Sequence, residues 1–161
     1  MSLTLVSPDY PSERLYNSIA RLLAANKLCS IGTQRENGEV HINTAFFAFG
    51  DDLDLYFLSN PASVHCQNLI RSRQVAIAVF DSHQIWGTAH KGLQLFGICA
   101  LATGIEEKIA RELYSSRFPL YMELRDRLSH LRFYRFTTAA VKVLDEDEFG
   151  EEVIVSAEVV R

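Results

Sequence analysis

The 161-residue sequence has few cysteines, a single tryptophan and no apolar run long enough to cross a bilayer. Its three cysteines, Cys29, Cys66 and Cys99, lie far apart with no C-x-x-C pair, which argues against a disulfide framework and favours reduced thiols. Residues 1–16 carry charges and prolines where a signal peptide needs an apolar stretch. We therefore expect a cytoplasmic protein with no membrane contact.

The charge balance is slightly acidic, with a formal net charge of −4. Nucleic acids attract clusters of lysine and arginine, and this sequence has no such basic footprint. Apolar residues make up 48% and charged residues 22%, as in ordinary globular proteins. No repeat, linker or low-complexity tract interrupts residues 1–161, so we predict a single domain that does not bind nucleic acid.

Helices are expected in two longer stretches and in a short segment over residues 61–71. Residues 11–26 predict an N-terminal helix, because four apolar side chains share one face: Leu15, Ile19, Leu22 and Leu23. A helical insertion is expected over residues 105–130, followed by strands over residues 131–160. Within the latter, the acidic run 145–152 indicates a solvated turn.

The rest of the chain has the patterns of strands. Asn37-Gly38 between two apolar runs predicts a hairpin with a type I′ turn, because both residues tolerate positive φ. Strand-like runs occupy residues 28–33, 40–49, 53–58, 75–80 and 93–103. About six strands with flanking helices predict a mainly β, α+β fold: a small antiparallel barrel with peripheral helices.

A polar segment between two of these strands is the candidate for chemistry. Ser59, Ser63 and His65 lie at the start of a short predicted helix, where the dipole and the unpaired N–H groups favour an anion. The alternative is a helix cap at Ser63 followed by a surface histidine. Cys66 reads as a buried free thiol, because adjacent helix residues do not face each other and no G-x-S-x-G motif is present.

Five histidines raise the question of a metal, but their spacing does not support one. No pair stands at i, i+4 on a helix and no cysteine cluster accompanies them, so no metal site is predicted. A haem ligand among them stays open. The histidines are His41, His65, His83, His90 and His130.

Several segments, in this order, carry a resemblance to a known family. They are Asn37-Gly38, Leu55-Tyr56-Phe57-Leu58-Ser59, Ser63-Val64-His65-Cys66-Gln67-Asn68-Leu69, Val75-Ala76-Ile77-Ala78-Val79 and Lys91-Gly92-Leu93-Gln94-Leu95-Phe96-Gly97. Through them, residues 28–104 resemble the FMN-binding split-barrel family, whose best-known members are pyridoxamine 5′-phosphate oxidases. The last third looks more like a little-characterised bacterial branch. The resemblance implies a six-stranded antiparallel split β-barrel.

The resemblance also implies a homodimer that binds FMN in a cleft at the subunit interface. The isoalloxazine ring would be lined by Asn43, Thr44, Ala45 and Phe46, and the adjoining strand would contribute Leu58 and Ser59. The phosphate would be bound by Ser63 and His65, and the site would be closed by Lys91 and Gln94.

The chain departs from the family pattern where the oxidases place cations. Those four positions hold Asn43, Ala48, Val64 and His65. Because charge-assisted contacts to phosphate are the stronger ones, weaker phosphate binding is expected, and His65 contributes best when protonated. Lys91 and Arg71 are the candidate replacements.

Three functions follow from the resemblance and these departures. The first is an FMN-dependent oxidoreductase of unknown substrate, with no convincing catalytic acid or base. Pyridoxamine phosphate is not the expected substrate, because the C-terminal tryptophan and arginine of the oxidases have no counterparts. The second is a non-catalytic flavin- or haem-binding protein, and the third is an apo structural dimer.

Overall fold

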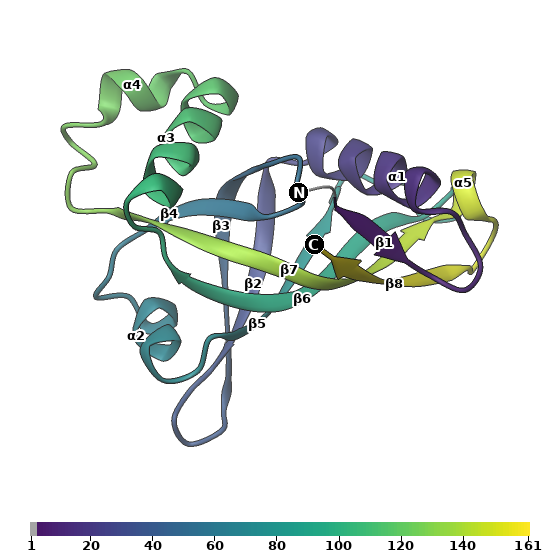
Figure 1. Cartoon of the computed structure of the whole chain (residues 1–161), viewed down its shortest axis with the longest axis horizontal. Coiled ribbons are helices and arrows are strands. Elements are labelled where there is room, and N and C mark those ends of the chain that lie inside the picture. Colours follow the sequence, from purple (N-terminus) through teal and green to yellow (C-terminus); the bar gives the residue numbers. More distant parts are fainter. Residues whose placement is uncertain (1–2) are drawn as a thin grey trace.

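A computed structural model describes residues 3–161 as a closed six-stranded antiparallel barrel with two further strands and several helices (Figure 1). The ring runs β7-β4-β3-β2-β5-β6 and closes where β6 pairs with β7. The strands are β1 Thr4–Val6, β2 Leu28–Gln34, β3 Val40–Phe49, β4 Leu55–Ser59, β5 Gln74–Phe80, β6 Lys91–Leu101, β7 Arg132–Asp145 and β8 Ile154–Val160. The helices are α1 Ser12–Ala25, α2 Val64–Arg71, α3 Ile105–Arg117, α4 Leu120–Leu124 and α5 Glu146–Phe149. The expected antiparallel split barrel is confirmed.

The two strands outside the ring extend one edge of β7. β8 pairs with residues 140–144 of β7, and β1 pairs with β8 (Figure 1). The sequence patterns did not predict β1, whose three residues are too few for a visible alternation.

The barrel interior is filled by apolar side chains that alternate with outward-facing ones along each strand. Phe47, Phe57 and Phe136 are completely buried there. α1 covers one opening of the barrel with the predicted stripe, which is buried in the same core: Leu15, Ile19, Leu22 and Leu23. Each such side chain contributes about 1.5–3 kcal/mol by leaving water, so the stripe fixes α1 on the barrel.

The β2–β3 hairpin contradicts the predicted turn type. Only Gly38 has a positive φ, of 86°, whereas a type I′ turn needs positive φ at Asn37 as well. The Gly38 N–H donates to the Arg35 carbonyl, and the Arg35 N–H donates to the Glu39 carbonyl. The connection is therefore a longer loop with one left-handed glycine, and the type I′ prediction was wrong.

The acidic run 145–152 also differs from expectation, because it begins with a buried carboxylate. Asp145 is fully buried, and its Oδ2 accepts hydrogen bonds from Ser18 Oγ at 2.7 Å and Arg21 at 2.6 Å. Both donors belong to α1. The first residue of the supposed solvated turn therefore ties the end of β7 to the N-terminal helix.

A second buried carboxylate, Asp54, joins the β3–β4 turn to the C-terminal strands. Its Oδ2 accepts from Arg135 Nε at 2.8 Å, and its Oδ1 accepts from the Thr138 N–H at 3.1 Å and from the Arg161 guanidinium. Arg135 also bonds to Glu106 Oε1, at 2.6 Å. The charge is paired on both oxygens, as a buried carboxylate requires.

None of the helices within residues 3–161 is both long enough and apolar enough to cross a bilayer.

Asp54→Asn tests how much the barrel depends on this network. The substitution keeps the size of the side chain and removes the charge that the two guanidiniums face, so we expect the free energy of unfolding to fall by about 3 kcal/mol. The matched control is Glu106→Gln, which removes the partly exposed partner of the same arginine and should cost less than about 1 kcal/mol. Urea unfolding followed by circular dichroism measures both. Equal losses in the two variants would contradict a dominant role for the buried carboxylate.

Candidate functional site

Two serine hydroxyls converge on one histidine where β4 ends and α2 begins. The Oγ of Ser59 lies 2.5 Å from Nε2 of His65, and the Oγ of Ser63 lies 3.2 Å from the same nitrogen. Ser59 is the last residue of β4, and Ser63 is the residue before α2. The structure thus brings together three of the predicted site residues, which we call the serine–histidine cluster.

The first turn of α2 lacks a side-chain cap within residues 3–161, because the hydroxyl of Ser63 is directed at His65 instead of at the helix N–H groups. The free N–H groups and the positive end of the helix dipole both favour an anion at this point.

β3 brings a second histidine close to the serine–histidine cluster. The rings of His41 and His65 are nearly parallel, with an interplanar angle of 8° and centroids 6.3 Å apart. Nearby on β3, the side-chain oxygen of Asn43 is buried and has no hydrogen-bond partner among residues 3–161. An unpaired buried acceptor costs about 1–3 kcal/mol, so Asn43 is suited to a ligand that donates a hydrogen bond.

The remaining predicted residues of β3 and β4 point in different directions. Ala45 packs against the interior core, whereas Thr44 and Phe46 alternate with it and are exposed on the outer face. Leu58 packs beside a separate small core under α3, which includes Tyr56 and Phe133. Only part of the predicted set therefore faces His65.

Cys66 lies directly behind the serine–histidine cluster and is buried. Burial raises the pKa of its thiol, but hydrogen bonds from nearby side chains outweigh burial and lower the pKa to about 7. These side chains are His65, Ser63, Tyr134 and Ser59. In Cys29, by contrast, burial raises the pKa to about 12. Tyr134 was missed in the sequence, where nothing marks it as a neighbour of the distant residue 66.

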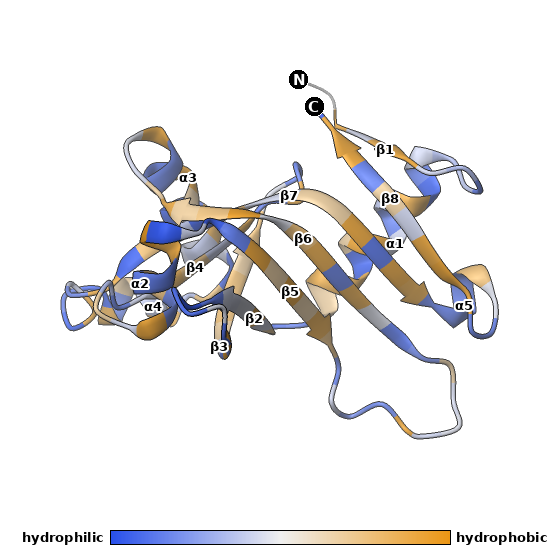
Figure 2. Ribbon diagram, turned by 90° about the horizontal axis from the view of Figure 1, so that it is seen from below, coloured by the Kyte–Doolittle hydropathy of each residue, from blue (hydrophilic) through white to orange (hydrophobic). Residues whose placement is uncertain are grey.

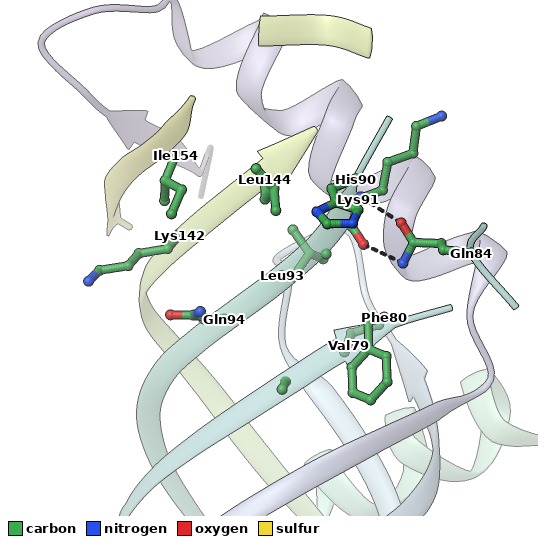
Figure 3. A pocket seen from close by; sticks show the side chains of 12 residues that line it. Val79, Phe80, Gln84, His90, Lys91, Leu93, Gln94, Lys142, Leu144 and Ile154 are labelled. Atoms are coloured by element: carbon green, nitrogen blue, oxygen red, sulfur yellow. Dashed lines mark hydrogen bonds between the residues drawn. The ribbon is translucent and has the colours of Figure 1, made fainter. Parts of the chain in front are cut away.

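Lys91 and Gln94 line a different cavity, of about 310 Å³, on the outer side of β5 and β6 (Figure 3). The backbone N–H and carbonyl of Lys91 are both bonded to the Gln84 side chain, at 2.7 and 2.9 Å. Gln94 stands beside Lys142 on β7. This cavity therefore has a fixed loop on one side and a lysine on the other.

Within one chain, this cavity is remote from the serine–histidine cluster. α2 leads into Gln74, which pairs with Ile98 at the far end of β6 from Lys91. Ile98 stands seven positions further along β6 than Lys91, a span of about 23 Å. The Lys91 ammonium is also paired with Asp147, at 2.5 Å.

Arg71, the other candidate replacement cation, is paired with Glu36 across the β2–β3 hairpin loop. Both candidate cations therefore already have carboxylate partners.

Comparison with known proteins places the chain in a family. Residues 17–145 match the family model described as pyridoxamine 5′-phosphate oxidase. No curated protein matches the chain.

Several solved structures share the fold at low sequence identity. A haem binding protein from Mycobacterium smegmatis is 16% identical with a TM-score of 0.72, and the match covers 89% of this chain but 57% of that one, less than two thirds of its length. HutZ, the haem storage protein from Vibrio cholerae, is 16% identical with a TM-score of 0.62, over 76% of this chain and 88% of that one. A Clostridium acetobutylicum protein related to general stress protein 26, of the pyridoxinephosphate oxidase family, is 13% identical with a TM-score of 0.68, over 91% and 95%.

The thiol environments predict selective alkylation. At pH 8 we expect iodoacetamide to modify Cys66 before Cys29, because most of the Cys66 thiol is ionised there and almost none of the Cys29 thiol is. Mass spectrometry of peptides measures the rates, which should rise to half their maximum near pH 7 for Cys66. His65→Ala should slow the reaction of Cys66 at pH 7. Equal rates at the two cysteines in the wild-type protein would contradict the proposed hydrogen bonding.

Proposed function

The chain belongs to the pyridoxamine 5′-phosphate oxidase family, and from this premise we propose that it binds FMN and works as a flavin-dependent oxidoreductase. The observation that carries the proposal is the convergence of Ser59, Ser63 and His65 at the uncapped first turn of α2. This arrangement supports an anchor for the phosphate of the cofactor.

The donors and acceptors present fit FMN at both of its polar ends. Two hydroxyls, an imidazole and free helix N–H groups suit the phosphate, while the buried unpaired oxygen of Asn43 suits an N–H on the ring. When bound, FMN supplies the redox chemistry, and the chain supplies binding and orientation. Without arginine or lysine at the phosphate, binding rests on neutral donors and on His65, which predicts modest affinity.

A second copy of the chain is proposed to complete the site. The ribbons of β5 and β6 carry both hydrophobic and hydrophilic residues (Figure 2). The strand register places apolar side chains of β3, β2, β5 and β6 on one outer surface, separated by small residues such as Gly32 and Ala76. We call this surface the outer apolar face; its large exposed members are Leu28, Val40, Ile42, Phe46, Phe80, Phe96 and Ile98. Such a patch on a globular protein marks an interaction surface. We infer that two copies of the chain pack against each other through the outer apolar face. In this homodimer the Lys91–Gln94 region of one subunit would approach the serine–histidine cluster of the other.

Haem is the second candidate, favoured by one observation. The rings of His41 and His65 are nearly parallel, with centroids 6.3 Å apart, so two imidazoles lie close together. Two of the proteins with similar folds are described as haem binding and haem storage proteins. FMN is preferred to haem because the uncapped helix turn and the two serine hydroxyls are donors that suit the phosphate of FMN.

FMN binding is tested by titration with fluorescence detection and by retention of yellow colour on a desalting column. We expect Ser63→Ala and His65→Ala each to weaken binding about tenfold, since each removes a donor to a charged group. The matched control is His83→Ala in the exposed loop before β6, which should leave the affinity unchanged. A protein that ignores FMN at high micromolar concentration but gives a Soret band with haem, lost in His65→Ala, would replace the flavin assignment with the haem one.

The homodimer is tested by sedimentation velocity. Ile42→Glu introduces a charge into the outer apolar face, where the wild-type side chain is 68% exposed, and should convert dimer to monomer. Trp86→Glu is the matched control, because this equally apolar residue is 92% exposed in the loop between β5 and β6. A wild-type monomer at micromolar concentration, or a dimer unaffected by Ile42→Glu, would contradict this arrangement.

A further inference from the structure

A cavity of about 400 Å³ lies between α3, α4 and the segment that leads into β7. In Figure 1 these two helices stand together at one end of the barrel, above β4. The cavity falls within the size range of sites for small molecules. Its polar lining includes three arginines and two carboxylates, together with Tyr121; they are Arg111, Arg125, Arg132, Glu107 and Asp126. We call it the arginine cavity.

The three guanidinium groups differ in how far their charge is already neutralised. Arg111 is paired with Glu107 at 2.8 Å and also donates to the hydroxyl of Tyr121 at 3.3 Å. Its charge is therefore largely satisfied, and its role in the wall is to hold the tyrosine hydroxyl in place.

Arg132 is oriented without being neutralised. Its Nη1 donates to the backbone carbonyls of Ser129 and Leu131, at 2.7 and 2.9 Å. These acceptors are uncharged, so the guanidinium keeps its full positive charge in a fixed position. Preorganised guanidinium groups of this kind bind carboxylate and phosphate with two parallel hydrogen bonds.

Arg125 is also only weakly paired. Its nearest carboxylate is that of Asp126, at 3.7 Å, and the Asp126 side chain is 96% exposed. An exposed pair at this distance contributes little and is easily exchanged for a ligand. Arg125 and Arg132 thus present two available cations to one cavity.

The arginine cavity and the serine–histidine cluster both lie near the end of β4. Arg132 pairs directly with Ser59 across β7 and β4. Leu58, the residue before Ser59, lines the cavity and points to the opposite face of β4 from Ser59. The cavity is therefore a site separate from the cluster.

We propose that the arginine cavity binds a small molecule with a carboxylate or phosphate group. The site depends only on the arginines and is independent of the proposed flavin binding. The proposal assigns Arg125 and Arg132 as binding residues, and Arg111 as a positioning residue that acts through Tyr121.

The test measures anion binding to the full chain by isothermal titration calorimetry at constant ionic strength. Succinate and glycerol 3-phosphate are the two probes, so the arms distinguish a carboxylate from a phosphate site. We expect at least one of them to bind with a Kd of about 1 mM or lower. The double variant Arg125→Gln/Arg132→Gln should weaken that binding by about tenfold or more, since it removes two charge-assisted contacts.

The matched control is Arg127→Gln, which changes an exposed arginine in the same turn that does not line the cavity. It removes one positive charge near the site, half of the change in the double variant, and should leave the Kd within twofold. FMN affinity is measured on the same variants and should not change.

The outcomes separate the two proposals. Anion binding that depends on Arg125 and Arg132 in a protein that does not bind FMN would support the site and remove the flavin account. FMN binding without affinity for either probe at about 10 mM would overturn the arginine site and leave the flavin account standing. Equal weakening by Arg127→Gln would reduce the effect to general charge and would also overturn the proposal.

Discussion

The structure depends on β7, the strand that closes the barrel and pairs with three others. Its 14 residues pair with β4 at one end, with β8 at the other and with β6 along nearly the whole length. The register shifts between Phe96 and Gly97, and a Cβ at Gly97 would collide with the carbonyl oxygen of Thr137. Only glycine allows β6 to approach so closely, so the closure of the barrel is fixed by one small residue.

The same strand delivers the polar groups that organise the molecule. Arg135 pairs with the buried Asp54, Asp145 ties α1 to the barrel, and Tyr134 lies behind the serine–histidine cluster. The cluster forms where the sheet opens: β3 pairs with β4 only over residues 47–49, so Asn43 and Ser59 diverge. α2 follows β4 at this point and contacts β2 and β3, and its first turn is uncapped.

The sequence predicted what local patterns encode. The stripe of α1 and the alternation of the strands identified the barrel, and the position of Ser63 and His65 at the start of a helix led to the proposed anion site. The sequence could not predict the turn at Asn37, whose φ depends on the length of the whole loop. It also could not predict Tyr134 or Arg132, because their approach to the cluster depends on long-range strand register. The sequence did not predict the burial of Asp145, because its hydrogen-bond donors Ser18 and Arg21 lie on α1, more than 120 residues away in the chain.

The most direct test of this account compares FMN with riboflavin, which differs only by the phosphate. If the first turn of α2, the two serines and His65 hold that phosphate, FMN should bind at least about tenfold more tightly than riboflavin, and Ser63→Ala should narrow the difference. Equal affinities for the two flavins would contradict the central claim, because the ring would then bind without its anchor.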